Sequence, residues 1–179
     1  FTGIKEADTD QLKALGAAMA ASGAVALYHA EGLTPEAGYM DTSELETISV
    51  SPDDIKGTYE NLNTGDLPDI VILGCPHASL REIASVAENV EGKKLNRPLW
   101  VCTSRCMKEA ADLMGFTSKI ESAGGKVVAD TCMVVSPIEQ MGYKTTGVNS
   151  GKAANYLPGF CKQQVVFHNL EDLIGRLEK

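Results

Sequence analysis

Short hydrophobic runs alternate with helical patterns along most of the chain. Strand-like runs occupy Ala24–His29, Asp69–Leu73, Pro98–Cys102, Lys126–Ala129, Thr145–Val148 and Gln164–His168. Most of these runs are continuously apolar, and most are followed by a helical pattern. That combination is typical of parallel strands buried on both faces. The predicted fold class is therefore α/β, with a mostly parallel sheet and helices on both faces.

Helices are expected between these runs. Their predicted ranges are 9–22, 51–63, 79–90, 104–114, 117–122, 137–141, 152–156 and 170–177. The helix at 51–63 has the clearest beginning, because a capping serine is followed by proline and two acidic residues, Ser51-Pro52-Asp53-Asp54. The length of 179 residues suits one compact unit. We expect 1–179 to form a single α/β domain.

Charge and cysteine content limit the classes of protein to which this chain can belong. The net charge of −8 and the pI near 4.9 argue against nucleic acid and anionic membranes, since both select basic surfaces. No apolar run reaches the ~20 residues that a membrane-spanning helix needs, and the sequence shows no signal peptide. Five cysteines without a secretory signal indicate reduced thiols, so we expect a cytoplasmic protein.

Reactive side chains follow the carboxyl ends of five predicted strands. Three of these ends carry a cysteine: Cys75, Cys102 and Cys132. The five segments that follow the strands are 29–32, 74–79, 102–105, 130–132 and 149–152. Because ligands of open α/β sheets bind outside the carboxyl ends of the strands, we expect these segments to form one small-molecule site.

Several of these residues have an ordinary structural interpretation. Cys106, one turn into a helix, is expected to be a packing residue and not a ligand, and Cys161, which precedes its strand, has no assigned role. His29 and His77 suit a satisfied polar position as well as acid–base chemistry. Arg105 and Lys152 begin helices, where the macrodipole disfavours cations but backbone N–H groups bind anions. We therefore expect these two to contact an anionic ligand.

Spacing leaves the chemistry of the thiols open. The chain has no CxxC pair, Walker loop, GxSxG elbow or GxGxxG after a strand. Cysteines that are distant in sequence but converge on strand ends are compatible with an iron–sulfur cluster. A cysteine nucleophile, Cys75 with His77 or His29, is the competing interpretation.

Four ordered motifs resemble the large subunit of the aconitase X family. They are Leu27-Tyr-His-Ala-Glu-Gly-Leu-Thr-Pro-Glu-Ala37, Gly74-Cys-Pro-His-Ala-Ser79, Asp130-Thr-Cys-Met-Val-Val135 and Asn149-Ser-Gly-Lys-Ala-Ala-Asn-Tyr156. The family includes phosphomevalonate dehydratase and cis-3-hydroxy-L-proline dehydratase, and its large subunits are longer than this chain. The resemblance implies an aconitase-like α/β domain from the carboxyl-terminal part of such a subunit.

The resemblance also implies a dehydratase, a hydro-lyase whose iron–sulfur cluster binds a small hydroxy-carboxylate. Cys75 and Cys132 match the family motifs and are the expected cluster ligands, and Cys102 is a substitute for a third ligand that lies upstream in the family. The candidate catalytic groups are His29, Glu31 and His77. The candidate substrate-binding residues are Ser79, Ser104, Arg105, Ser150 and Lys152.

A small swivelling subunit contributes part of the site in this family, so the resemblance implies a partner surface. The chain alone is expected to be inactive and to lack a complete cluster site. Two alternatives remain. One is a cysteine-nucleophile enzyme that uses Cys75 or Cys102, and the other is a non-catalytic ligand-binding or assembly domain with an acidic surface.

Overall fold

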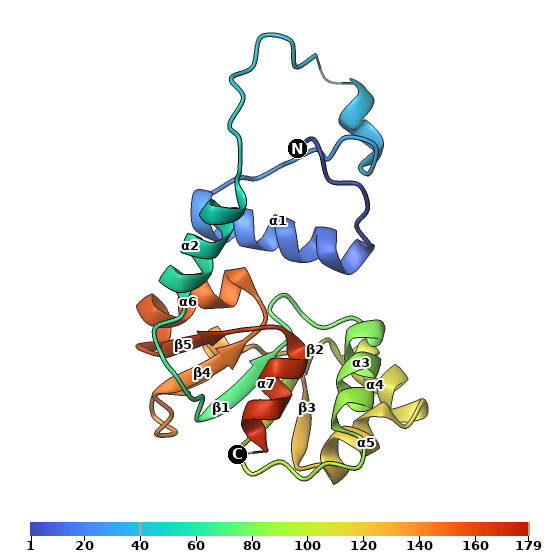
Figure 1. The fold of residues 1–179 in the computed structure, drawn as a ribbon. Coiled ribbons are helices and arrows are strands. Elements are labelled where there is room, and N and C mark those ends of the chain that lie inside the picture. The colour runs from blue at the N-terminus through green and yellow to red at the C-terminus, as the bar shows by residue number, and fades with distance from the viewer. Residues whose placement is uncertain (40, 179) are drawn as a thin grey trace.

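Five parallel strands form the centre of the molecule. The computed structural model describes residues 1–39 and 41–178. The strands are β1 (Ile70–Leu73), β2 (Leu99–Thr103), β3 (Gly125–Ala129), β4 (Thr145–Val148) and β5 (Gln164–Phe167), in the order β3-β2-β1-β4-β5. Every neighbouring pair is parallel (Figure 1). The predicted parallel sheet is confirmed.

Seven α-helices accompany the sheet in the described residues. They are α1 (Thr9–Gly23), α2 (Pro52–Leu62), α3 (Leu80–Val90), α4 (Arg105–Leu113), α5 (Phe116–Ser122), α6 (Gly151–Cys161) and α7 (Leu170–Leu177). Two 3₁₀ turns, η1 (Pro35–Tyr39) and η2 (Met133–Val135), complete the elements. The predicted start of α2 is confirmed, since Ser51 and Asp54 form a reciprocal capping box. None of the described helices is both long and apolar enough to span a bilayer.

Helices cover both faces of the sheet, as expected. On β1, Val71 and Leu73 belong to a core shared with α3, α4, α5 and α7, whereas Ile70 and Ile72 belong to a second core shared with α6. Successive side chains of a strand point to opposite faces. Two covered faces therefore explain why β1 reads as an uninterrupted apolar run.

The first helix lies across the carboxyl ends of the strands (Figure 1). It packs on the beginning of α6, where Asn155 donates a hydrogen bond to Ala21 O at 3.0 Å and a Cβ on Gly151 would lie 3.3 Å from Ala18 Cβ. No residue of α1 is fully buried. Side chains that remain partly exposed, and not a buried core, therefore hold α1 in its position.

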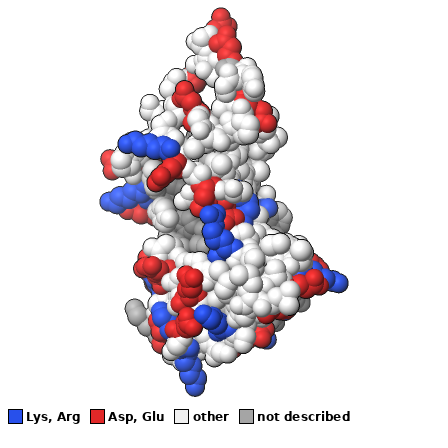
Figure 2. Space-filling view, turned by 90° about the vertical axis from the view of Figure 1, so that its right-hand side faces the viewer, with Lys and Arg blue, Asp and Glu red and all other residues white. Residues whose placement is uncertain are grey.

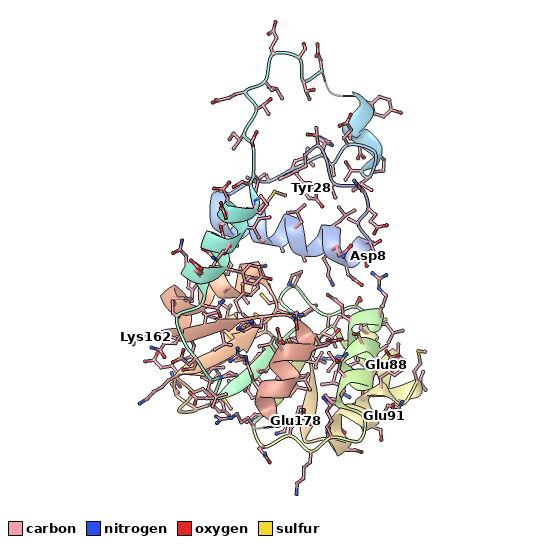
Figure 3. All side chains as sticks on the ribbon, viewed as in Figure 1. Asp8, Tyr28, Glu88, Glu91, Lys162 and Glu178 are labelled. Carbon is pink, nitrogen blue, oxygen red and sulfur yellow. The ribbon has the colours of Figure 1, made fainter. Side chains whose placement is uncertain are left out.

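The predicted strand at 24–29 is wrong. Ala24 ends α1 in the left-handed conformation, and the residues after it pair with no strand among those described. Val25 and Leu27 are 42% and 75% exposed. Tyr28 lies on the side of α1 away from the sheet (Figure 3) and donates a hydrogen bond to Leu12 O at 2.8 Å. An apolar pattern becomes a strand only when a partner edge is available, and this segment has none.

Two helix predictions also need correction. Residues 137–141 are not helical, since 138–142 form turns, and the short helix of this region is instead η2. The helix predicted at 152–156 runs from Gly151 to Cys161 and contains Pro158. Leu157 and Cys161 are buried on either side of this proline. Their packing stabilises the helix beyond a residue that removes a backbone hydrogen bond.

Candidate functional site

A tight loop after β1 holds the first candidate cysteine. Gly74 has φ +87°, and a Cβ there would lie 1.9 Å from Cys102 O, so only glycine fits. Cys75 follows and is 6% exposed. The hydroxyl of Ser150 donates a hydrogen bond to Cys75 O. Ala78 N donates to Cys102 O at 2.9 Å, which ties the far end of the loop to β2.

Two of the three candidate cysteines face one cavity. This cavity, which we call the thiol cavity, has a volume of about 500 Å³. Its lining includes Cys75, Cys132, His77, Lys152 and Tyr156. The structure thus brings together the carboxyl ends of β1 and β3 and the first two turns of α6, as the strand-end argument predicts.

The charges around Cys75 act in opposite directions. Burial raises the pKa of its thiol, and the nearby Cys132 raises it further. The Lys152 ammonium and a hydrogen bond with Ser150 lower it. The net pKa is raised, so Cys75 by itself is a protonated thiol at neutral pH. A positive charge or a metal ion in the cavity would favour the thiolate.

Cys102 occupies a different environment. It is the fourth residue of β2 and has no exposed surface. Burial raises the pKa of its thiol to about 12, with further contributions from Cys132 and Cys75. At pH 7 only roughly one molecule in 10⁵ carries this thiolate. Cys102 is therefore a poor nucleophile in this fold.

The described residues do not complete a metal site. No group of three or more His, Cys, Asp or Glu side chains among residues 1–39 and 41–178 is arranged to hold a metal ion. Cys75 and Cys132 have the right donor chemistry and share a cavity. Two thiols alone do not make a cluster site, so a cluster here would need at least one further ligand.

The three candidate serines begin helices. Ser79, Ser104 and Ser150 accept hydrogen bonds from backbone N–H groups in the first turns of α3, α4 and α6. Ser79 also donates to Asp10 Oδ2 at 2.9 Å. Their hydroxyls thus have a structural role at helix starts, and of the three only Ser150 also contacts the Cys75 backbone.

The two candidate cations differ in their partners. Arg105 binds Asp130 through its backbone N–H, its Nε and its Nη2, with all three distances at 2.9 Å. Lys152 forms no ion pair with the part of the chain that the structure describes, and it lines the thiol cavity. Lys152 is therefore the cation that is available to an anionic ligand beside Cys75.

The candidate catalytic residues lie in two places. His77 lines the thiol cavity, and its Nε2 lies 2.9 Å from Thr131 O. His29 and Glu31 line a different cavity of about 610 Å³ with Tyr28 and Leu45. The expectation that they share a rim with the cysteines is wrong, because it depended on the absent strand at 24–29.

The other two cysteines are separate from the cavity. Cys106 is exposed on α4, so the expectation that it is a packing residue is wrong. Cys161 is buried, and its thiol lies 3.7 Å from Val134 O and 3.9 Å from Met133 O, next to the segment that follows Cys132.

Sequence reasoning included Asp130 and Tyr156 in its motifs but gave neither an individual role. Asp130 lies just after β3 with φ +57° and orients Arg105. Its signal was an aspartate at a strand end, a residue that tolerates the left-handed conformation. Tyr156 lies four residues after Lys152 on α6, and this spacing places both on one helix face.

Family models match nearly the whole chain. Residues 1–60 match the second domain of aconitase X, and residues 68–178 match its third domain. The chain is 55% identical over 170 residues to the phosphomevalonate dehydratase large subunit of Methanocaldococcus jannaschii, covering 93% of this chain and 42% of that protein. It is 31% identical to the cis-3-hydroxy-L-proline dehydratase of Pseudomonas aeruginosa, covering 93% of this chain and 30% of that protein.

A solved structure agrees with these matches. The holo-form of Thermococcus kodakaraensis aconitase X superposes with a TM-score of 0.91 and 43% identity, covering 97% of this chain and 45% of that one. The chain thus spans less than half the length of these relatives. The resemblance to this family is confirmed, and the chain belongs to the aconitase X family.

Proposed function

We propose that this chain is part of a hydro-lyase that dehydrates a small hydroxy-carboxylate. The observation that carries the proposal is the cavity in which Cys75, Cys132, His77 and Lys152 meet. Relatives with 44% to 55% identity are large subunits of phosphomevalonate dehydratases. Phosphomevalonate is therefore the first substrate to test, and cis-3-hydroxy-L-proline is the second.

Cys75 and Cys132 are the proposed ligands of an iron–sulfur cluster. When bound, such a cluster supplies a Lewis acid that makes hydroxide a better leaving group. The third ligand comes from outside this chain or, after rearrangement, from Cys102. The buried position of Cys102 makes the first source the better candidate.

Lys152 is the proposed contact for the substrate's carboxylate or phosphate. Its charge lies beside Cys75, and it is the second residue of α6, directly after the N-cap Ser150 and Gly151. The positive end of this helix and the ammonium together favour an anion. Arg105, whose guanidinium is held by Asp130, has a smaller role.

His77 is the proposed proton acceptor that this chain contributes. A carbonyl oxygen can only accept, so the contact with Thr131 O keeps the proton on Nε2. The lone pair of the neutral ring is then on Nδ1, which is the atom able to take a proton. His29 and Glu31 would take part only if another region of the enzyme brought them to the substrate.

The complete enzyme is proposed to include a small subunit and to work in the cytoplasm. Several relatives are named large subunits, which implies a second chain. The cysteines are free thiols, which suits a reducing compartment. The partner would close the thiol cavity, and without it the chain is expected to be inactive.

The test is anaerobic co-expression of a large subunit containing this chain with its small subunit. Iron, sulfide and visible absorption would be measured, and each substrate would be assayed for loss of water. Cys75→Ser and Cys132→Ser should lower iron content at least about threefold, whereas the exposed Cys106→Ser should leave it unchanged. Normal iron in both cavity variants would refute the ligand assignment. Alkylation-sensitive turnover without iron would instead support a cysteine nucleophile.

A further inference from the structure

A network of charges joins the beginning of α1 to the beginning of α3. Its residues are Asp8, Asp10, Lys13, Ser79, Arg81 and Glu82. Asp10 accepts from Ser79 Oγ at 2.9 Å and from Arg81 at 2.7 and 3.0 Å. Lys13 Nζ lies 2.5 Å from Glu82 Oε2 and 3.2 Å from Asp10 Oδ1.

This α1–α3 network connects two family domains. Residues 1–60 match the second domain and residues 68–178 the third, so every contact between α1 and α3 crosses from one to the other. Figure 2 shows acidic and basic side chains close together where the upper and lower parts of the molecule meet. Figure 3 labels Asp8 at the start of α1, above the first turn of α3.

One residue of the network also contacts the loop at residues 75–78, which carries Cys75. Lys13 Nζ donates to His77 O at 3.2 Å, across 64 residues of sequence. The other hydrogen bonds of this loop are made with the sheet rim: Ser150 to Cys75 O, Thr103 Oγ1 to Ala78 O, Ala78 N to Cys102 O, and the His77 ring with Thr131 O. Among the described residues, Lys13 makes the hydrogen bond to residues 75–78 that comes from the second family domain.

The ammonium of Lys13 is already neutralised. Glu82 and Asp10 flank it, and its side chain is 29% exposed. Glu82 Oε2 also accepts from Ser79 N at 2.8 Å, so the same carboxylate caps α3 and holds Lys13. Lys13 is therefore held in one orientation. It donates to His77 O and is not available to bind a substrate anion.

We propose that Lys13 is a positioning residue that holds the Cys75–His77 loop against the sheet rim. This role rests on the proposed function only for its kinetic consequence, because the loop geometry exists without catalysis. When Lys13 is lost, His77 O exchanges its charged donor for water, and the loop gains freedom around both cavity residues. A displacement of about 1 Å in a reacting group can cost about 100-fold in rate.

The first test measures the loop directly in the iron-free full chain. Lys13→Met, Lys13→Arg and the surface control Lys108→Met would be treated with iodoacetamide, and each cysteine followed by mass spectrometry. Lys13→Met should speed alkylation of Cys75 about tenfold, which is the change in loop opening expected when a charged hydrogen bond is removed. Lys13→Arg should restore most of the protection, and Lys108→Met should match the wild type.

The rate at Cys106 is the internal reference for the wild type and the Lys13 variants, because this thiol is exposed on α4. An unchanged Cys75 rate in Lys13→Met would overturn the proposal. Equal acceleration at Cys75 and at the buried Cys102 would overturn it too, since that pattern means general unfolding.

The second test uses the two-subunit enzyme. Lys13→Met should lower kcat about tenfold with less than a twofold change in KM, and Lys13→Arg should recover most of the loss. A normal kcat in Lys13→Met would overturn the positioning role. Faster Cys75 alkylation in an enzyme that dehydrates neither substrate would instead refute the proposed function and leave the positioning role intact.

Discussion

The carbonyl oxygen of Cys102 lies directly against Gly74, at a place where a Cβ would come within 1.9 Å of it. This contact joins the end of β1 to β2 and directs the chain into the Cys75 loop. Ala78 N closes the same loop by donating to the same carbonyl oxygen at 2.9 Å. The backbone of one candidate cysteine thus shapes the loop that presents another.

Gly74→Ala should destabilise the protein by about 2–5 kcal/mol. The φ of +87° is strained for alanine, and the new methyl group would press on rigid backbone. Urea unfolding followed by circular dichroism measures the change. Gly57→Ala is the matched control: it lies within α2, nothing is within 4 Å of its Cβ, and it should stabilise by about 0.5–1 kcal/mol. Equal effects at both positions would contradict the structure.

Removing the Cys102 thiol should flatten the alkaline fall in stability. The folded pKa of about 12 lies above the reference value of 9.0, so the folded state disfavours the thiolate. Below pH 9 both states are protonated and the thiol adds no pH dependence. Above pH 9 the unfolded chain ionises first, and stability falls by at most about 1.4 kcal/mol per pH unit until the folded pKa is reached.

The measurement is urea unfolding of the iron-free wild type and Cys102→Ala at pH 8, 9, 10 and 11. The difference between the two proteins should shrink as pH rises, because the variant lacks this titration. Cys106→Ala, which removes an exposed thiol, should follow the wild-type curve. Parallel curves for Cys102→Ala and the wild type would show that the thiol ionises as easily in the folded protein as in the unfolded chain.

Lys152→Gln should impair substrate binding more than Arg105→Gln. Lys152 lines the thiol cavity, whereas the Arg105 guanidinium is engaged by Asp130. Loss of a charged hydrogen bond to an anionic substrate predicts about a tenfold rise in KM for Lys152→Gln, and we expect less than threefold for Arg105→Gln. Steady-state kinetics of the two-subunit enzyme checks both values. The reverse order would move the anion site to the start of α4.

Asp130 should keep a depressed pKa even when the arginine side chain is removed. The backbone N–H of Arg105 is the largest cause of the shift, and the guanidinium adds to it. NMR titration of Arg105→Gln should therefore show a smaller depression that still lies below the reference value of 3.8. A value at or above 3.8 would assign the shift to the side chain alone.

His77 should be the Nε2–H tautomer when neutral. Its Nε2 lies 2.9 Å from the carbonyl oxygen of Thr131, which can only accept a hydrogen bond. Long-range ¹H–¹⁵N correlation spectra distinguish the two ring nitrogens of the neutral side chain. A protonated Nδ1 in the neutral ring would remove His77 as the proposed proton acceptor.

The sequence alone determined the α/β class and most of the site. Continuous apolar runs such as Ile70–Leu73 can be buried only between two layers, and parallel strands bring their carboxyl ends to one edge. Cys75, Cys132, His77 and Lys152 could therefore be placed near one another before any coordinates.

Tertiary structure decided the rest, because those features depend on contacts between distant residues. The run at 24–29 has strand-like residues but no neighbouring strand among those described. His29 and Glu31 therefore line another cavity than expected. Cys102 lies within β2 and has no exposed surface, whereas Cys75 follows β1 and lines the thiol cavity. The contact of Lys13 with His77 spans 64 residues and leaves no local pattern. Periodicity reports which face of an element is buried, whereas the partner on that face is set by packing.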